Sequence, residues 1–176
     1  MSQSHTPTTT HHKAGNDTPR LWGDKRYHTW NYHLRQHNIR VCCHIIYGLP
    51  QETDEMMLET AREVSKLDIQ GLKIHLLHVL KFTPMVRQYE QGLLQFLEKV
   101  QYVNLVVKTL EMMPPELIIH RVTGDGPGDL LIGPMWSVNK WDVLNSIDRE
   151  LKNRNTWQGK LWNPAIRLEQ KKVVQK

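Results

Sequence analysis

Residues 41–53 read VCCHIIYGLPQET, a short apolar run that leads into a Gly-Leu-Pro turn. Apart from His44, the first seven residues are β-branched, aromatic or small and apolar, which favours a strand buried on both faces, as in a parallel sheet. Thr53 is a suitable N-cap for a helix whose first turn contains Asp54 and Glu55. Because α/β folds bind ligands at the carboxyl ends of their strands, we expect a ligand at this turn.

The composition indicates a single soluble domain. The chain has 176 residues, of which 39% are hydrophobic, and no apolar run approaches the roughly 20 residues that a membrane helix requires. The N-terminus contains no apolar stretch typical of a secretory signal, so we expect a cytoplasmic protein without membrane contact. Cys42 and Cys43 are adjacent and cannot form an ordinary disulfide with each other, so we expect both to be reduced.

The net charge of +5 is unevenly distributed. Residues 1–40 contain six Lys or Arg against two acids, residues 41–148 nine against fourteen, and residues 149–176 eight against two. Basic ends can attract RNA or another polyanion, whereas a solvated and partly disordered tail is the commoner explanation of such a composition. The charge alone is therefore weak support for binding to nucleic acid.

The chain divides into four segments by composition and periodicity. Residues 1–22 are rich in Ser, Thr, His, Gly and Pro, and we expect them to be disordered. Residues 23–37 contain an N-terminal helix, residues 38–155 the α/β domain, and residues 156–176 a basic tail.

Alternation between strand and helix patterns predicts an α/β fold with right-handed crossovers. Strands are expected at 39–47, 72–80 and 116–122. Helices are expected at 26–37, 54–67, 85–90, 102–112 and 137–151, with a further helical segment at 92–99. Apolar residues spaced for one buried face are Met57, Ala61, Val64 and Leu67 in the second helix and Trp141, Leu144 and Ile147 in the last.

Two histidines lie in the predicted strand 72–80. Strand alternation places His75 and His78 on opposite faces, so we do not expect them to share a metal ion. Each is either a hydrogen-bonded histidine of the core or rim, or a functional group. The sequence contains no zinc spacing, and we predict no metal site.

A second group of candidates follows the predicted strand 116–122. His120 and Arg121 are expected to point to opposite faces, beside the glycine-rich loop 123–129, TGDGPGD. Asp125 in this loop could bind a cation or a ribose hydroxyl, or could stabilise its own turn. No Walker loop, Ser-His-Asp order or Gly-x-Gly-x-x-Gly motif is present, so these patterns indicate a ligand-binding α/β domain and no particular reaction.

Four longer runs allow a more specific interpretation. They are IRVCCHIIYGLPQET, LDIQGLKIHLLHVLK, YVNLVVKTLEMMPPELIIHRVTGDGP and IGPMWSVNKWDVLNSIDREL. In this order they resemble the C-terminal part of the YhcC-like family of radical S-adenosylmethionine (SAM) proteins, and RYHTWNYHLRQ is similar to the start of the family's N-terminal segment. The resemblance implies a partial TIM-like radical SAM barrel, about half of a complete one.

The resemblance also implies a place for SAM. In the wider superfamily the fifth strand carries a Gly-x-Ile-x-Gly-x-x-Glu-like motif that supports the adenosine part of SAM. The residues in that place here are Ile46, Gly48, Gln51 and Glu52, with His44 instead of the first glycine. After the next strand, Phe82 stands where the family pattern has glycine, and we expect its bulk to crowd the turn.

The reaction centre of the family has no counterpart in this sequence. Family members hold a four-iron four-sulfur (4Fe-4S) cluster through a C-x-x-x-C-x-x-C loop, because iron-sulfur units require thiolate ligands. Gln36 is followed almost at once by the strand-five region, as if the first half of the barrel had been removed. Cys42 and Cys43 cannot replace three spaced ligands, so we expect no autonomous radical chemistry.

These observations lead to a primary hypothesis and two alternatives. The primary hypothesis is a truncated or internally deleted radical SAM protein that keeps a weak or partial SAM site. A non-enzymatic module that binds a nucleotide, RNA or a partner protein is the first alternative, and a gene fragment without selected function is the second. Half a barrel leaves open sheet edges and apolar faces, which predicts self-association.

Overall fold

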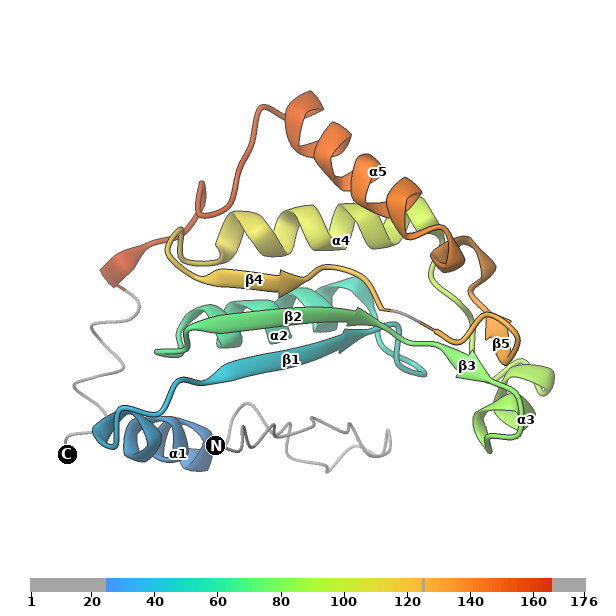
Figure 1. The fold of residues 1–176 in the computed structure, drawn as a ribbon, viewed down its shortest axis with the longest axis horizontal. Helices are drawn as coiled ribbons and strands as arrows, with labels where there is room; N and C mark the ends of the chain where they lie inside the picture. Colours follow the sequence, from blue (N-terminus) through green and yellow to red (C-terminus); the bar gives the residue numbers. More distant parts are fainter. Residues whose placement is uncertain (1–24, 125, 166–176) are drawn as a thin grey trace.

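The computed structural model describes residues 25–124 and 126–165 (Figure 1). The expected disordered segment 1–22, Asp125 and the last part of the basic tail lie outside the described residues. The elements follow in the order α1 (Lys25–Gln36), β1 (Cys42–Tyr47), α2 (Asp54–Ser65), β2 (Gly71–Leu76), β3 (Val79–Leu80), α3 (Met85–Glu90), α4 (Lys99–Met112), β4 (Ile118–Arg121), β5 (Leu131–Gly133), a 3-10 helix (Met135–Val138) and α5 (Lys140–Asn153).

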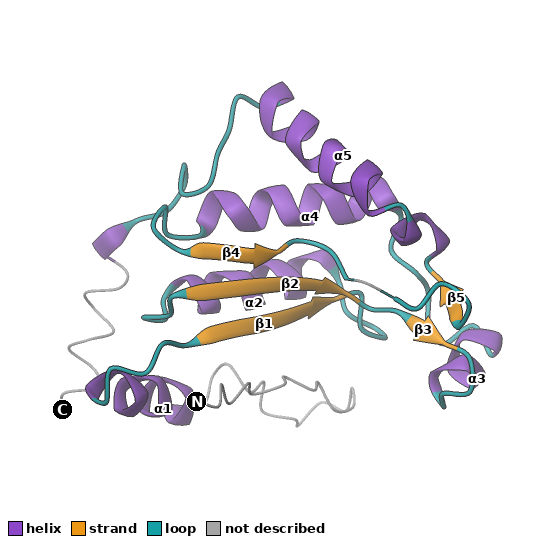
Figure 2. Ribbon diagram, viewed as in Figure 1, coloured by secondary structure: helices purple, strands orange, loops and turns teal. Residues whose placement is uncertain are grey.

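Three parallel strands in the order β1-β2-β4 form the main sheet. Helices α2 and α4 lie against one face of this sheet, and α5 packs against α4 (Figure 2). The chain is therefore an α/β protein with an open parallel sheet, and the strands of the described residues form no closed barrel. Within the described part of the chain, β1 and β4 are edge strands, and self-association through them stays a prediction.

The faces of β1 show that the sheet is covered on one side only. Cys43, Ile45 and Tyr47 are buried under the helices, whereas Cys42, His44 and Ile46 alternate with them and are half-buried. The prediction of a strand buried on both faces is therefore wrong, because no layer of described residues covers the second side. We call this second side the open face; it carries the side chains of Cys42, His44 and Ile46 on β1 and of Lys73 and His75 on β2.

The core between the sheet and its helices contains a buried chain of hydroxyl groups. The Thr109 hydroxyl donates to the carbonyl of Leu105 at 2.7 Å, so the Tyr47 hydroxyl, 2.6 Å from the Thr109 oxygen, is the donor to it. The Tyr102 hydroxyl donates to the carbonyl of Val122 at 3.0 Å. Because each buried hydroxyl has a partner, α4 is held at one position along the sheet without an unsatisfied polar group.

Helix α2 has the boundaries and buried stripe that its sequence predicts. The N–H of Met56 donates to the Thr53 hydroxyl at 3.3 Å, which makes Thr53 the N-cap. Met57, Ala61 and Val64 are fully buried.

The predicted strand 72–80 is two strands in the structure. β2 ends at Leu76, and β3 instead pairs antiparallel with β5, with Val79 opposite Gly133. The three residues of β5 were not predicted, because so short a strand carries no period of its own. The segment 92–99 is not helical before Lys99.

Helix α5 begins later than predicted and buries a different face. Asn139 caps it by accepting from the N–H of Asp142 at 3.1 Å, after the 3-10 helix. Val143 and Ile147 are buried, whereas Trp141 is 75% exposed, so its assignment to the buried face was wrong. In the described ranges 25–124 and 126–165, no helix is long and apolar enough to cross a membrane.

Residues 156–161 pack against the end of α4 and the start of β4. The Gln158 side chain donates to the carbonyls of Pro114 and Leu117 at 2.7 and 2.8 Å. The N–H of Leu161 donates to the carbonyl of Glu111 at 2.9 Å. This part of the basic C-terminal segment therefore belongs to the folded domain.

Phe82 does not crowd its turn, contrary to the expectation from its bulk. Its side chain is 94% exposed, while its backbone is left-handed with a φ of +66°. Phe82 therefore lowers the stability of the fold through its backbone conformation, because a left-handed φ is unfavourable for a residue with a Cβ and not for glycine.

We predict that Phe82→Gly raises the free energy of unfolding by about 1 kcal/mol, because it removes the left-handed strain. Chemical denaturation of the wild type and the variant measures the difference. Phe82→Ala is the matched control, since it removes the exposed ring but keeps the strain, and it should change stability much less. Equal effects of the two substitutions would contradict the assignment of the cost to the backbone.

Candidate functional site

Gly48 lies in the turn after β1, where the backbone comes close to the neighbouring elements. Gly48 has a φ of +86°, and its N–H points at the sulfur of Met57, 3.3 Å away. A Cβ at this position would lie 3.2 Å from the side chain of Leu97. Any other residue would therefore combine backbone strain with crowding, so this position needs glycine.

Glu52 turns its side chain back onto this turn. Its carboxylate accepts from the N–H of Leu49 at 3.3 Å. Burial raises the pKa of Glu52 to about 7, although hydrogen bonds from the backbone of Leu49 and Gly48 act in the opposite direction. Near neutral pH the carboxyl is therefore present in both protonation states and can accept or donate a hydrogen bond.

The other two residues predicted for the SAM place lie apart from this carboxyl. Ile46 is half-buried on the open face, one residue before the end of β1. Gln51 is exposed and has a left-handed φ of +65°. Of the four predicted residues, Gly48 and Glu52 thus meet at the turn, Ile46 lines the neighbouring sheet face, and Gln51 lies on its rim.

His78 lies beneath the glycine-rich loop beside the ends of the strands. The Ser137 hydroxyl donates to the carbonyl of Pro134 at 2.7 Å, so it accepts from Nε2–H of His78, 2.9 Å away. A Cβ on Gly124 would lie 2.7 Å from Cε1 of His78, and one on Gly126 would lie 3.4 Å from its Nδ1. The two glycines therefore let the loop backbone approach the imidazole closely. Asp125, between them, lies outside the described residues.

His75 belongs to the open face. Its ring stacks on that of His44, with 5.2 Å between centroids and 25° between planes. Burial, and then the neighbouring charges on His44 and Arg121, lower the pKa of His75 to about 4. Burial also lowers the pKa of His44, as do the charges on Lys73 and Arg121.

The two predictions about paired side chains need correction. His75 and His78 are not on opposite faces of one strand, because β2 ends at Leu76 and His78 follows it in a loop. His120 and Arg121 do not simply alternate, because the β2–β4 register shifts by one residue after Leu72. His120 Nε2 lies 2.6 Å from the position of a Cβ on Gly71, and the Arg121 charge acts on both stacked histidines.

The cysteines do not fit an iron-sulfur cluster. Both thiols are free; Cys42 lies on the open face, whereas Cys43 points into the core, where burial raises its pKa to about 12. At most one of the two sulfurs could therefore meet a cluster on the open face. Within residues 25–124 and 126–165, no group of three or more His, Cys, Asp or Glu is arranged to hold a metal ion.

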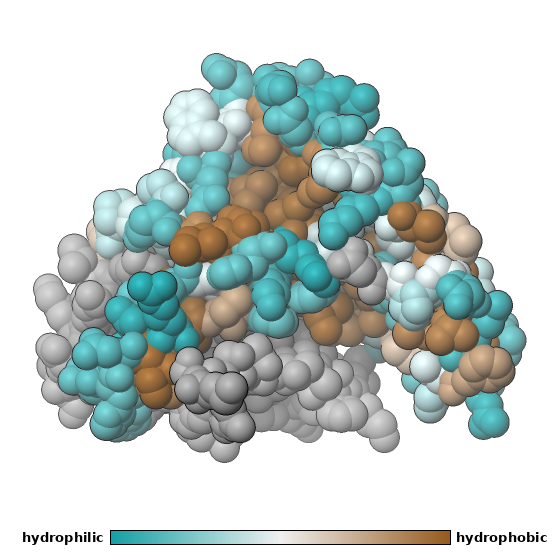
Figure 3. All heavy atoms as spheres, viewed as in Figure 1, coloured by the Kyte–Doolittle hydropathy of each residue, from teal (hydrophilic) through white to brown (hydrophobic). Residues whose placement is uncertain are grey.

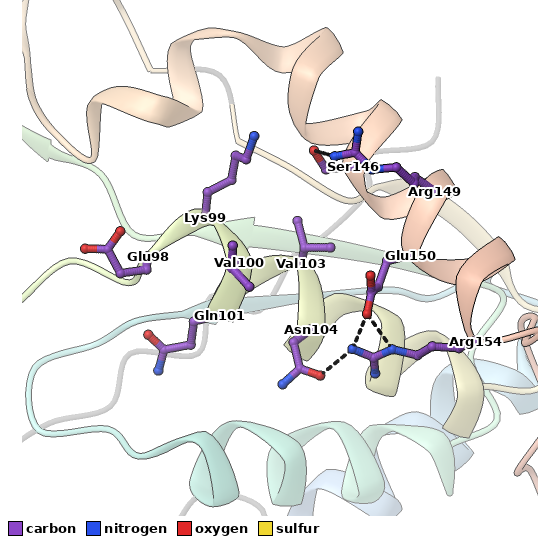
Figure 4. Close-up of a pocket in the computed structure, with 10 residues that line it drawn as sticks. All are labelled: Glu98, Lys99, Val100, Gln101, Val103, Asn104, Ser146, Arg149, Glu150 and Arg154. Carbon is purple, nitrogen blue, oxygen red and sulfur yellow. Dashed lines mark hydrogen bonds and ion pairs between the residues drawn. The ribbon is translucent and has the colours of Figure 1, made fainter.

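A separate groove of about 580 Å³ lies between α4 and α5 and contains none of the predicted site residues (Figure 4). Three of its charged residues form ion pairs. Arg154 pairs with Glu150 at 2.6 Å and donates to Asn104 at 2.9 Å, and Lys99 pairs with Asp142 at 2.7 Å. The groove is distinct from the strand-end site.

Comparison with known proteins shows where this architecture recurs. Residues 69–153 match the radical SAM C-terminal domain family. Over 141 residues the chain is 60% identical to the protein YtqA of Bacillus subtilis, and over 132 residues it is 32% identical to YhcC of Escherichia coli K12. The chain is a C-terminal radical SAM segment of the YhcC type. The resemblance inferred from the four sequence runs is therefore confirmed.

This radical SAM segment spans less than half of the length of the relatives that it matches. The matches cover 80% of the chain but 43% of YtqA, and 75% of the chain but 43% of YhcC. The protein MJ0486 of Methanocaldococcus jannaschii is 37% identical over 122 residues, which are 69% of the chain and 38% of that protein.

A solved structure supports the fold of the segment. Elp3 from Methanocaldococcus infernus, with an N-terminal deletion, superposes with a TM-score of 0.62 at 16% identity. The match covers 71% of this chain and 29% of Elp3. It shows the shared fold alone, and it agrees with a partial radical SAM barrel.

Some residues near the site were not predicted. Ser137 is the partner of His78 but lies 59 residues away in sequence, so no local pattern could have found it. Lys73 lies on the open face beside His44, and here the signal was present, since Lys73 and His75 alternate with apolar residues in β2.

We predict that Glu52 makes a contribution to the free energy of unfolding that falls as the pH rises from about 4.5 to about 7, and that Glu52→Gln removes this contribution. In that range the folded state holds a proton on Glu52 that the unfolded state, with its ordinary pKa of 4.5, has lost. The Glu52 contribution therefore falls with rising pH, whereas that of His75, whose pKa is lowered, rises. We compare the free energy of unfolding of Glu52→Gln with that of the wild type at each pH. Between pH 4 and pH values above 7, this difference should shift in favour of the variant by about 1–2 kcal/mol.

Urea denaturation at several pH values measures this effect. Glu90→Gln, at an exposed position in α3, is the matched control and should leave the slope unchanged. Parallel profiles for the wild type and Glu52→Gln would contradict a buried carboxyl at the turn.

Proposed function

We propose that this chain is the SAM-side part of a radical SAM barrel, that it binds SAM weakly at the turn after β1, and that it does not cleave SAM by itself. The observation that carries the proposal is the turn itself. At the carboxyl end of a parallel strand, Gly48 leaves the backbone of the turn uncovered by a side chain, and the Glu52 carboxyl faces the same turn. In a chain of the YhcC type, this is the place at which the family's SAM motif is expected.

The residues of the turn fit a nucleoside better than an anion. Backbone without a Cβ at Gly48 can lie against a flat ring or a sugar, and the Glu52 carboxyl can exchange hydrogen bonds with hydroxyl groups. Ile46 adds an apolar side chain on the adjoining sheet face. With only this part of the barrel, the ligand would be enclosed on one side, which is the reason for expecting weak binding.

The cluster does not fit the residues present, so no reaction step is assigned to it. The whole sequence has two cysteines, and they point to opposite faces of β1. In the family, the cluster supplies the electron for cleavage of SAM. The chain therefore requires a partner that carries a cluster, or it acts only as a binding protein.

We predict weak binding of SAM to the wild type in calorimetry and none to Gly48→Trp, because the indole would fill the turn and strain its backbone. Gln88→Trp, at an exposed position of α3, is the matched control and should bind as the wild type does. Circular dichroism establishes that each variant is folded.

Glu52→Gln provides a second variant that keeps the shape of the side chain. It should weaken binding several-fold, since the amide cannot ionise and offers a different set of donors and acceptors. Unchanged affinity in both Gly48→Trp and Glu52→Gln would contradict the assignment of SAM to this turn.

The first alternative, a non-enzymatic module that binds RNA through its basic ends, draws its support from the charge of residues 149–176, which contain eight Lys or Arg against two acids. It predicts affinity for RNA that falls steeply with salt. Because residues 156–161 pack against α4 and β4, the deletion that tests it should begin after residue 165. RNA binding that survives this deletion would contradict the hypothesis that the basic C-terminal residues bind RNA.

A further inference from the structure

The small sheet of β3 and β5 belongs to a side lobe that lies beyond the carboxyl ends of β1 and β2 (Figure 1). We define this side lobe as β3, α3, β5 and the 3-10 helix, which contact one another in pairs. Helix α3 has no buried residue, and Figure 3 shows hydrophobic areas among hydrophilic ones on the lobe, at the right of the view. Among the described residues of the lobe, Trp136 is the one that packs against the main hydrophobic core.

Trp136 joins the side lobe to the rest of the domain by a hydrogen bond and a ring contact. Its Nε1–H donates to the carbonyl of Leu97 at 2.9 Å. Its ring packs on that of Tyr102 in α4, with 5.5 Å between centroids. The ring contact fixes the place of the indole, so the direction of its N–H is fixed as well.

Leu97 in turn lines the turn after β1. Its Cγ and Cδ1 atoms each lie 3.2 Å from the position of a Cβ on Gly48. Residues 93–98 belong to no helix or strand, so secondary structure does not determine where this side chain lies. The hydrogen bond from Trp136 holds the backbone of Leu97 instead. The wall of the turn beside Gly48 is therefore positioned by an indole 39 residues later in the chain.

The polar groups of the two packed rings act on different parts of the chain. The Tyr102 hydroxyl donates to the carbonyl of Val122 at 3.0 Å. The indole has one N–H and no acceptor, so its bond to Leu97 uses its whole capacity for hydrogen bonds. Each bond can therefore be removed while an aromatic ring is kept at the same position.

We propose that Trp136 is a positioning residue for the SAM site, because its indole N–H holds Leu97 against Gly48 and so keeps the turn in the conformation that binds the ligand. This inference rests on the proposed binding of SAM at that turn. Trp136 acts through Leu97 and not by contact with SAM. A turn that is already held in its binding conformation loses less entropy when the ligand binds, so release of Leu97 lowers the affinity.

Trp136→Phe removes the N–H and keeps an aromatic ring. It should weaken SAM binding about fivefold in calorimetry on the full chain, the loss expected for one hydrogen bond. Tyr102→Phe is the matched control, because it also removes a single bond to a main-chain carbonyl. Both variants should melt at a lower temperature than the wild type, whereas only Trp136→Phe should lose affinity. Equal SAM affinities of the two variants would mean that Trp136 only supports the fold, and would overturn the proposal.

A second pair of variants tests the contact with the turn itself. Leu97→Val shortens the side chain at Gly48 and keeps the main-chain carbonyl that Trp136 binds. It should also weaken SAM binding, whereas Leu94→Val, at a position 2% exposed in the same segment, should not. Unchanged affinity in Leu97→Val would contradict the proposal. This pair carries the test should Trp136→Phe fail to fold.

The Gly48 amide proton provides a readout in the protein without SAM. Its hydrogen exchange, measured by NMR relative to that of Ile45 in the middle of β1, should be several times faster in Trp136→Phe than in the wild type, because the turn opens more often. Tyr102→Phe should leave this ratio unchanged. The same ratio in Trp136→Phe and in the wild type would overturn the link between the indole and the turn.

Failure of this inference is distinct from failure of the proposed function. If Gly48→Trp abolishes SAM binding while Trp136→Phe leaves it unchanged, SAM binds at the turn and the role given to Trp136 is wrong. If the wild type binds no SAM, the proposed function is wrong, and the role of Trp136 at a SAM site is overturned with it. Fivefold weaker binding in Trp136→Phe, together with faster exchange at Gly48, supports both.

Discussion

The parallel pairing of β1 with β2 is the interaction on which the rest of the structure depends. Its register runs from Cys42 opposite Gly71 to Tyr47 opposite Leu76. This register turns one set of side chains toward α2 and α4 and the alternate set toward the open face. A slip of one residue would exchange the two sets, burying His44 in the core and exposing apolar side chains to water. The core and the candidate sites are therefore set by the same hydrogen bonds.

The sequence predicts well the parts of the fold that are locally encoded. β1, α2 and the loop 123–129 follow from a run of β-branched residues, from a cap with a periodic stripe, and from clustered glycines. β5 and the division of strand 72–80 could not be predicted in this way, because both depend on pairing between Val79 and Gly133, far apart in the chain. The exposure of Trp141 likewise depends on which face of α5 packs against α4.

The same distinction applies to the candidate sites. The turn with Gly48 and Glu52 lies within one strand-turn-helix unit, so its residues could be picked out from the sequence and the family resemblance. The pairing of Lys73 with Arg121 could not be predicted, because a shift of register beyond Leu72 decides which residue of β4 is opposite Lys73. Alternation within a strand indicates which face a residue occupies, but only the paired strands show which residues meet.

The central claim is that this chain carries the SAM side of a radical SAM barrel without the means to reduce SAM. It rests on the two cysteines, which diverge across β1. Anaerobic iron-sulfur reconstitution, followed by measurement of iron, sulfide and SAM cleavage under reducing conditions, tests it most directly. We expect no stoichiometric cluster and no reductive cleavage of SAM by the chain alone. A 4Fe-4S cluster in each chain, together with SAM cleavage, would contradict the account.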